Sequence, residues 1–290
     1  MKRCGALIVF ALLAVSAWAG EVAESRSPRL VTLAPNLTEL AFAAGAGEQI
    51  VATVEYSDYP AAARSIPRIG DAFRVDLERL LALRPDVVLA WQSGTPVQLI
   101  ERMRALGLPV EIVATQRLAD VAQAVRRIGE LGGSHERAEQ AARTFEDAIA
   151  ELRGAYAEAP RVRVFLHINA QPLYTVNGRH IISEVAALCG GDNVFAALQE
   201  LAPTVGIEAV IAANPDAIIT TDENGPDTAH HWSRWQAMRA VRAGNVFTLS
   251  ADELTRATPR LAQAAQAMCR ALDTARENLR RTAVRSRTAR

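Results

Sequence analysis

The chain has 290 residues, half of them hydrophobic, and its 32 basic residues balance 32 acidic ones. This length leaves room for two domains or for one large domain. The zero net charge argues against a nucleic acid as a partner, because proteins that bind nucleic acids favour a basic surface.

Residues 1–19 are predicted to be a signal peptide. Lys2 and Arg3 supply the positive start, residues 6–15 supply the apolar segment, and residues 17–19 have the small-x-small pattern of a cleavage site. The apolar segment is too short to span a membrane. We expect cleavage near Ala19 and export of a soluble mature chain to the periplasm.

Residues 28–133 alternate short apolar runs with amphipathic segments, which predicts a first α/β lobe with a parallel sheet. The strands predicted in this lobe are 29–33, 50–54, 87–91 and 110–113. The predicted helices are 38–44, a short one from residue 77, 99–106 and 118–131. A turn is expected at residues 34–36, between the first strand and the first helix.

A single long helix is predicted over residues 134–157. Its apolar residues recur every three or four positions from Ala138 to Ala155, and charged residues occupy the other face. Ser134 is the candidate N-cap, and Pro160 ends the helix. At about 1.5 Å per residue the helix is roughly 35 Å long, which is enough to span a domain.

Residues 161–278 are predicted to form a second α/β lobe. Its strands are predicted at 162–168, up to residue 220, and at 246–249, and its helices at 181–188, from residue 207, and at 259–278. Residues 280–290 carry five arginines and little apolar content. We therefore expect residues 279–290 to be a disordered basic tail.

Two segments on either side of the long helix resemble each other. Residues 77–89 and 207–219 hold Glu, Pro and Asp in the same register, and each predicts a short helix, an X-Pro-Asp turn and a buried strand. Pro-Asp before an apolar run is common in any α/β protein, but the matching Glu favours a duplication. The predicted fold is therefore α/β, with two parallel-sheet lobes bridged by one long rigid helix.

Catalytic and metal-binding patterns are missing from the sequence. It contains no Gly-x-Ser-x-Gly, P-loop or Gly-x-Gly-x-x-Gly motif, so a periplasmic hydrolase is the least favoured alternative. All five histidines follow Ser134, so a metal ion between the lobes would have no histidine ligand from the first lobe. We predict no catalytic residues and no metal site.

Two cysteines, Cys189 and Cys269, remain after removal of the signal peptide. In an oxidising compartment, two cysteines far apart in sequence often pair. The alternative is two buried free thiols, and we favour the disulfide.

Aromatic residues make up only 5% of the chain, yet many of them fall in predicted loops or at strand ends. These residues are Tyr56, Tyr59, Phe73, Trp91 and Tyr174. Each one alone could pack on its own lobe. Together they suit a cleft that grips a large flat ligand by its faces.

The segment Leu33-Ala34-Pro35-Asn36-x-Thr38-Glu39-x-Ala41-Phe42-Ala43-Ala44-Gly45 is similar to the opening motif of periplasmic receptors with a helical backbone, the class III, metal-chelate type. From about residue 29 to residue 272 the chain resembles the cobalamin receptors of ABC importers within that class. The other markers are Tyr56-Ser57-Asp58-Tyr59-Pro60, Leu77-Glu78-Arg79, Arg84-Pro85-Asp86, Ala90-Trp91, Cys189-Gly190-Gly191-Asp192-Asn193 and Arg256-Ala257-x-Pro259-Arg260.

The resemblance implies a cobalamin held between the lobes. Its implied contacts are Tyr56, Trp91, Tyr174, Asp252 and Arg256. Two positions depart from the pattern, because Ala72 and Ala202 stand where those receptors have tryptophans. Phe73, next to Ala72, is a candidate replacement for the first tryptophan. Haem or a ferric siderophore is therefore kept as the alternative ligand.

The resemblance also implies a membrane partner. Glu78 and Glu208 match the pair by which these receptors dock on arginines of the permease dimer, one from each lobe. The alternative role for a glutamate in a first helical turn is stabilisation of the helix dipole. We expect a receptor that is monomeric when free and that exchanges its ligand with small lobe movements, because a long helix resists hinge opening.

Overall fold

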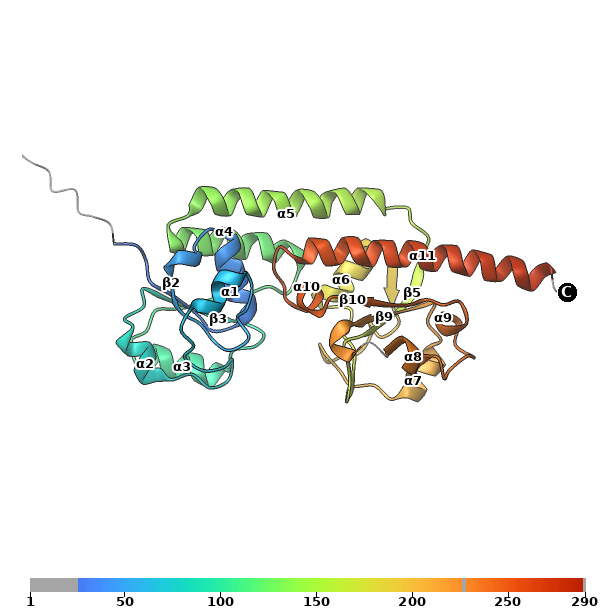
Figure 1. Cartoon of the computed structure of the whole chain (residues 1–290), viewed down its shortest axis with the longest axis horizontal. Coiled ribbons are helices and arrows are strands. Elements are labelled where there is room, and N and C mark those ends of the chain that lie inside the picture. Colours follow the sequence, from blue (N-terminus) through green and yellow to red (C-terminus); the bar gives the residue numbers. More distant parts are fainter. Residues whose placement is uncertain (1–25, 226–227, 289–290) are drawn as a thin grey trace, which may run out of the picture.

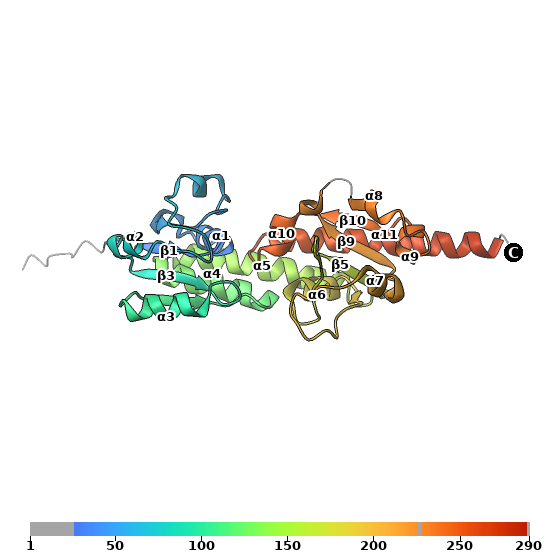
Figure 2. The ribbon, with the colours of Figure 1, turned by 90° about the horizontal axis from the view of Figure 1, so that it is seen from below.

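The computed structural model describes residues 26–225 and 228–288, so the predicted signal peptide lies outside the described residues. The chain forms two α/β lobes, and helix α5 (His135–Ala155) runs across both of them on one side (Figure 1). Seen from below, the two lobes follow each other along the long axis of the molecule (Figure 2). The predicted fold class is confirmed.

The first lobe contains a four-stranded parallel sheet in the order β2-β1-β3-β4. Its strands are β1 (Leu30–Thr32), β2 (Ile50–Ala52), β3 (Val87–Trp91) and β4 (Val110–Val113). Its helices are α1 (Pro35–Ala43), α2 (Leu77–Ala82), α3 (Val97–Ala105) and α4 (Leu118–Gly132), with short 3-10 turns η1 (Gly47–Gln49) and η2 (Ala61–Ser65).

The expected turn at residues 34–36 is wrong, because α1 already begins at Pro35. Proline suits the first position of a helix, where its missing N–H has no helical partner to lose and its φ is already close to the helical value.

The second lobe contains a four-stranded parallel sheet in the order β10-β9-β5-β8. Its strands are β5 (Val162–His167), β8 (Gly191–Asn193), β9 (Ala217–Thr221) and β10 (Val246–Leu249), and an antiparallel pair β6 (Asn169–Ala170) and β7 (Leu173–Tyr174) is added. Its helices are α6 (Ile181–Leu188), α7 (Ile207–Ala213), α8 (Thr228–Trp232), α9 (Arg239–Arg242), α10 (Ala251–Thr255) and α11 (Leu261–Thr288), with the 3-10 turn η3 (Asp222–Asn224).

The bridging helix α5 packs along α4. A Cβ atom at Gly129 of α4 would lie 2.1 Å from the Cβ of Ala138, so glycine is required for this close approach. Arg126 of α4 pairs with Glu139 and Glu146 of α5 at 2.7 and 2.6 Å. Ser134 precedes α5 but does not cap it with its side chain, because its hydroxyl donates to the carbonyl of Ala44 at 2.7 Å.

Helix α11 corrects the expectation of a disordered basic tail, because it continues to Thr288. Residues 260–288 contain no glycine or proline and are rich in alanine, arginine and leucine, which favour helix. An ion pair between Glu277 and Arg281, one turn apart, adds a little to its stability.

The two similar segments have the same local structure. Asp86 and Asp216 each accept a backbone N–H at the start of the neighbouring strand, from Arg29 at 2.7 Å and from Arg163 at 3.2 Å. Arg84 and Asn214, the residues before the two prolines, both adopt left-handed backbone angles, with φ of 45° and 43°. Such a conformation is uncommon for residues other than glycine, so its recurrence supports the duplication.

Candidate ligand-binding site

A cavity of about 470 Å³ opens between the two lobes. The first lobe lines it with Trp91, Ser93, Thr115 and Gln116, and the second lobe lines it with Arg179, His180, Ile181, Leu201, Ala202, Thr255 and Ala257. Trp91 is the last residue of β3, and Thr115 follows β4. The cavity therefore lies at the carboxyl ends of parallel strands, where open α/β sheets bind ligands.

Trp91 is held in one orientation by its neighbours. Its indole N–H donates to the hydroxyl of Thr115 at 3.0 Å, and its backbone N–H donates to the hydroxyl of Thr95 at 2.9 Å. Gly94 lies directly against the ring, since a Cβ there would come within 2.2 Å of a ring carbon. The ring is thus fixed before a ligand arrives, which reduces the entropy lost on binding.

His180 places a neutral imidazole at the cavity. It stands at the N-cap of α6, where its Nδ1 accepts the N–H of Ile182 at 3.2 Å. Burial lowers the pKa of His180 to about 4, so the ring is uncharged at neutral pH. Because Nδ1 is the acceptor, the ring proton resides on Nε2.

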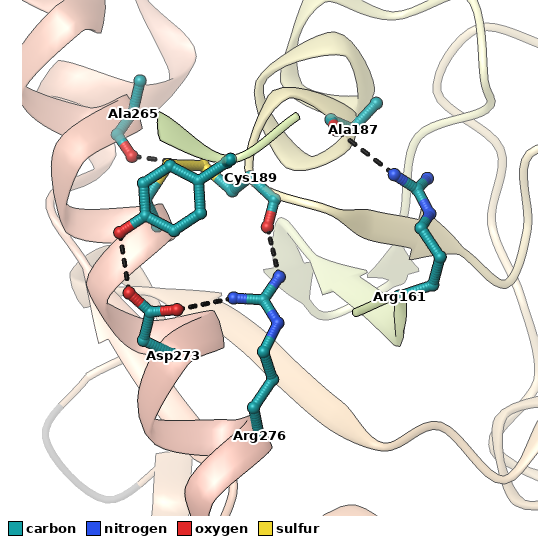
Figure 3. Close-up of a disulfide and its surroundings, with 8 residues drawn as sticks. Arg161, Ala187, Cys189, Ala265, Asp273 and Arg276 are labelled. Atoms are coloured by element: carbon teal, nitrogen blue, oxygen red, sulfur yellow. Dashed lines mark hydrogen bonds and ion pairs between the residues drawn. A yellow bond between two sulfur atoms is a disulfide. The ribbon is translucent and has the colours of Figure 1, made fainter. Parts of the chain in front are cut away.

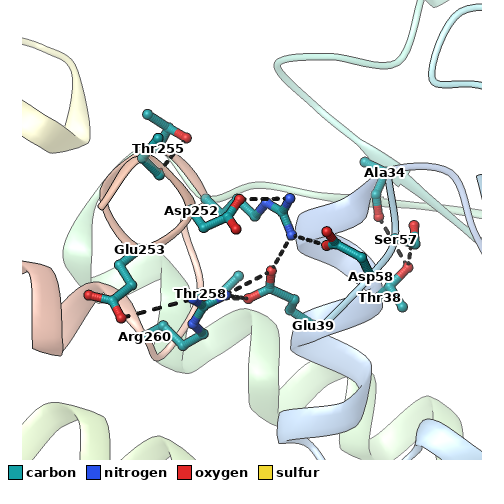
Figure 4. A network of polar contacts seen from close by, with 12 residues as sticks. Ala34, Thr38, Glu39, Ser57, Asp58, Asp252, Glu253, Thr255, Thr258 and Arg260 are labelled. Atoms are coloured by element: carbon teal, nitrogen blue, oxygen red, sulfur yellow. Dashed lines mark hydrogen bonds and ion pairs between the residues drawn. The ribbon is translucent and has the colours of Figure 1, made fainter. Parts of the chain in front are cut away.

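Beside the cavity, Arg256 ties the second lobe to the first through Glu39 and Asp58. Figure 4 shows these two carboxylates facing Asp252 of the second lobe. The guanidinium of Arg256 lies 2.7 Å from a carboxylate oxygen of Glu39 and 2.9 Å from Asp58, both in the first lobe, and 2.8 Å from Asp252 in α10. Arg260 adds a weaker contact to Glu39 at 3.4 Å. The side chain of Glu39 is only 2% exposed, so these arginines neutralise a buried charge.

The same network shifts the ionisation of its members. Burial on its own would raise the pKa of the Asp58 carboxyl, but the hydrogen bond and the charge of Arg256 hold that pKa below its ordinary value. Burial would likewise lower the pKa of Arg256, and its hydrogen bonds to Glu39 and Asp58 raise it instead. Asp58 and Arg256 are therefore both charged at neutral pH.

Of the six residues predicted to contact the ligand, Trp91 alone lines the cavity itself. Asp252 and Arg256 belong to the ionic network that adjoins it through Thr255 and Ala257. Tyr174 in β7 pairs with Thr204, two residues from Ala202 in the cavity wall.

Tyr56 and Phe73 carry large rings that the fold leaves uncovered. Their exposed fractions are 78% and 72%. Tyr56 has a left-handed backbone with φ of 64°, which is strained for an aromatic residue. Phe73 is held in a tight turn in which the carboxylate of Asp71 accepts the N–H groups of Phe73 and Arg74 at 2.8 and 2.7 Å. Ala72, in the same turn, is partly buried.

Glu78 and Glu208 occupy equivalent positions in α2 and α7. Each lies in the first turn of its helix and is exposed to solvent. Neither takes part in an ion pair among the residues that the structure describes. In the same two helices, Leu80 and Val210 are fully buried.

The predicted disulfide between Cys189 and Cys269 is confirmed (Figure 3). It joins the end of α6 to α11, with Cα atoms 4.7 Å apart. Next to it, Arg276 of α11 donates to the carbonyl of Cys189 at 2.5 Å, and Asp273 accepts both from Arg276 and from the hydroxyl of Tyr156 at 2.7 Å. These contacts fasten the end of the bridging helix to the second lobe.

No role was predicted from the sequence for Glu39, Arg179 or His180. Glu39 offered a signal, because a carboxylate beside Leu37 and Leu40 on an apolar helix needs a buried partner. Arg179 and His180 offered no local signal, since the cavity exists only when the two lobes meet.

Within residues 26–225 and 228–288, no helix has the length and apolar character needed to cross a membrane. Over the same residues, no group of three or more His, Cys, Asp and Glu side chains is arranged to hold a metal ion.

The profile of a family described as "Periplasmic binding protein" matches residues 30–253. The chain belongs to the periplasmic binding protein family. It is similar to the vitamin B12-binding protein of Vibrio cholerae serotype O1, with 36% identity over 242 residues, which cover 83% of this chain and 87% of that protein. The members of this family bind substrates for transport.

Solved structures of this family have the same arrangement. The periplasmic vitamin B12-binding protein BtuF of Vibrio cholerae superimposes with a TM-score of 0.82 at 35% identity, over 86% of this chain and 98% of that one. The periplasmic heme-binding protein RhuT from Roseiflexus sp. RS-1 gives 0.74 at 26% identity, over 86% and 99%. The fold is that of the class III periplasmic binding proteins.

Proposed function

We propose that this protein captures cobalamin between its two lobes in the periplasm and delivers it to the permease of an ABC importer. The observation that carries the proposal is the interlobe cavity with its fixed Trp91, in a chain that is 36% identical over 242 residues to a vitamin B12-binding protein. Cobalamin is the transported ligand and not a cofactor.

The aromatic residues provide surfaces for a large flat ring. Trp91, Tyr56 and Phe73 come from the first lobe, and Tyr174 comes from the second. What supports a contact role for Tyr56 and Phe73 is their exposure, because a folded protein usually covers rings of this size. The strained backbone of Tyr56 supports the same role, since such strain of roughly 1–3 kcal/mol persists where function requires it.

Polar groups would fix the edge of the ligand. Ser93, Gln116 and Thr115 line the cavity with hydroxyl and amide groups that can form hydrogen bonds with polar groups of the ligand. Asp252 is half exposed beside Arg256 and retains a free carboxylate edge for the same purpose. Arg256 itself would serve mainly to hold the lobes at the correct spacing.

The binding test is a titration of the mature chain, residues 20–290, with cyanocobalamin and with haem in parallel. We expect one equivalent of cyanocobalamin to be retained through gel filtration, with its visible absorption bands. Haem is the second candidate, because the haem-binding RhuT shares the fold and because Ala202 leaves room in the cavity wall. Retention of haem with no retention of cyanocobalamin would replace the proposed ligand.

Delivery would use Glu78 and Glu208 as docking contacts, one on each lobe. Their exposure and equivalent placement support this role. Replacing both with alanine should leave cobalamin affinity unchanged and weaken assembly with the permease, because charge pairs at an interface steer encounter and fix register. A matched control replaces Glu101 and Glu200, which are also exposed to solvent, and should affect neither measurement.

The docking proposal has a clear contrary outcome. If the Glu78/Glu208 variant loses cobalamin binding while it still assembles with the permease, the two residues belong to the ligand site. Added salt should weaken assembly of the unmodified protein more than that of the double variant, since it screens the same charges. We also propose that the free receptor is a monomer and that its signal peptide is cleaved near Ala19.

A further inference from the structure

The charged side chains that line the interlobe cavity are of one sign, which is positive. Among the described residues that line it, none is acidic and Arg179 is the one cation. A cavity of this kind favours a ligand group that carries negative charge or several hydrogen-bond acceptors. The feature was not anticipated from the resemblance, whose implied contacts are aromatic rings, Asp252 and Arg256.

Arg179 keeps its charge available for a ligand. One guanidinium nitrogen donates to the carbonyl of Gln199, and the backbone N–H donates to the side chain of Asn177 at 2.9 Å. Both partners are neutral, and the ion pairs of the described residues include none with Arg179. The carbonyl bond orients the guanidinium, and the remaining N–H groups can form a charge-assisted pair with an anion.

His180 adds a neutral donor next to this cation. Its Nδ1 is occupied by the N–H of Ile182, which leaves Nε2–H as the donor of a side chain that lines the cavity. No hydrogen bond within residues 26–225 and 228–288 uses that Nε2 atom. A ligand in the cavity can therefore receive a hydrogen bond from an imidazole and another from a guanidinium.

The volume of the cavity fits only a part of a cobalamin molecule. A volume of about 470 Å³ is in the range that holds a drug-sized group. A complete cobalamin is much larger, but its nucleotide loop, a dimethylbenzimidazole ribosyl phosphate, is of this size. The loop also carries the phosphodiester, which is the one anionic group at the periphery of the vitamin. The short side chain of Ala202 leaves the cavity open where a tryptophan would fill it.

We propose that this cavity is a subsite for the nucleotide loop of cobalamin, in which Arg179 pairs with the phosphodiester and His180 donates Nε2–H to an oxygen of the same loop. The inference rests on the proposed function and adds to it a preference for complete corrinoids. Trp91, in the wall of the cavity, would then contact the edge of the ring system, while Arg179 and His180 bind the nucleotide loop.

The test compares two ligands that differ in the loop. Cyanocobalamin carries the nucleotide loop, and dicyanocobinamide has the same corrin ring without the loop and its phosphate. Calorimetric titration of the mature protein and of Arg179→Gln with both ligands separates loop contacts from ring contacts. We expect the substitution to weaken cyanocobalamin about tenfold and to change dicyanocobinamide by less than about twofold, since a tenfold change is about 1.4 kcal/mol.

A matched control replaces Arg242, which is also exposed on the second lobe and also donates to a backbone carbonyl, but lies outside the cavity. Arg242→Gln should leave both affinities unchanged. His180→Asn tests the second contact while keeping a side chain that can cap α6, because asparagine is a good N-cap. It should weaken cyanocobalamin about twofold to fivefold more than dicyanocobinamide.

The outcomes are distinguishable. Equal loss of both ligands in Arg179→Gln, or no loss of either, overturns the subsite. If the unmodified protein binds neither corrinoid, the proposed function itself fails. Tight binding of dicyanocobinamide by every variant also shows that the variants are folded, so a selective loss of cyanocobalamin cannot be attributed to unfolding.

Discussion

Arg256 is predicted to stabilise the apo protein chiefly through Glu39. Replacing Arg256 with methionine keeps the length of the side chain and removes its charge. The carboxylate of Glu39, only 2% exposed, would then be left with Arg260 at 3.4 Å and the hydroxyl of Thr258 at 3.3 Å. Loss of one partner from a buried ion pair costs about 3–5 kcal/mol.

The contacts that Glu39 keeps with Arg260 and Thr258 reduce this cost. Arg260 still supplies a positive charge, so we expect Arg256→Met to lower the free energy of unfolding by about 2–4 kcal/mol at pH 7. For a chain of this size the fall in Tm would be on the order of 10 °C. The assay is urea denaturation followed by circular dichroism without ligand, with a parallel thermal scan.

Two further variants test whether the buried charge of Glu39 causes the loss of stability. Asp58→Asn removes the half-exposed partner of the same arginine and should cost no more than about 1 kcal/mol. Glu39→Gln combined with Arg256→Met removes both buried charges and should be more stable than Arg256→Met alone. The reasoning is refuted if Arg256→Met is within about 1 kcal/mol of the unmodified protein, or if Asp58→Asn costs as much as Arg256→Met.

Three other predictions can be checked with standard assays. Trp91→Ala should weaken cobalamin binding by about 1–3 kcal/mol, the contribution of a buried aromatic contact, and unchanged affinity by calorimetry would place the ligand elsewhere. Removing the disulfide, whose cysteines are 80 residues apart, should lower the free energy of unfolding by roughly 3–5 kcal/mol. Thiol titration of the unfolded, unreduced protein should find no free thiol. Hydrogen bonds from Arg126 and then Arg143 lower the pKa of Glu139 from 4.5 to about 2. Because the folded pKa is the lower one, its stabilisation is present above pH 4.5 and is lost as the pH falls toward 2. Scans of Tm against pH should therefore show Glu139→Gln and the unmodified protein converging in this acid range.

Local patterns in the sequence were sufficient for most of the fold. The period of three and four residues located the bridging helix within one or two residues of its observed ends, because a helix that buries one face must repeat its apolar residues in this way. The duplicated Glu, Pro and Asp were also informative, since Asp86 and Asp216 make the same backbone bond in both lobes. The end of α11 was missed, because a run of arginines was taken as a sign of disorder although it is also compatible with a helix.

The site was less accessible to such reasoning. Trp91 was predicted as a site residue because it ends a strand, but the partners of Arg256 lie about 200 residues away in the sequence. No periodicity or local motif encodes which residues of one lobe will face those of the other. The wall formed by Arg179, His180 and Ala202 likewise depends on how the two lobes meet.

The contacts between the lobes set a condition on ligand release. Arg256 with Glu39 forms one contact between the lobes, and Glu184 of α6, which accepts the N–H of Leu118 at 2.9 Å, forms another. Opening the cleft widely would expose the Glu39 carboxylate to water but separate it from its arginine, and it would leave the N–H of Leu118 without its acceptor. The free protein is therefore expected to stay close to this arrangement and to exchange ligand slowly.

A permease that contacts both proposed docking residues, Glu78 and Glu208, would change the equilibrium between the closed and open arrangements of the lobes. Glu78 belongs to the first lobe and Glu208 to the second, so contacts to both act on the two lobes separately. A permease whose binding sites are spaced slightly wider than the two helices would gain its contacts only as the lobes move apart. The free energy of docking would then oppose the Arg256–Glu39 pair directly. Strengthening or weakening that pair should consequently alter release in the complex more than affinity in the free receptor, which links the stability of the apo protein to transport.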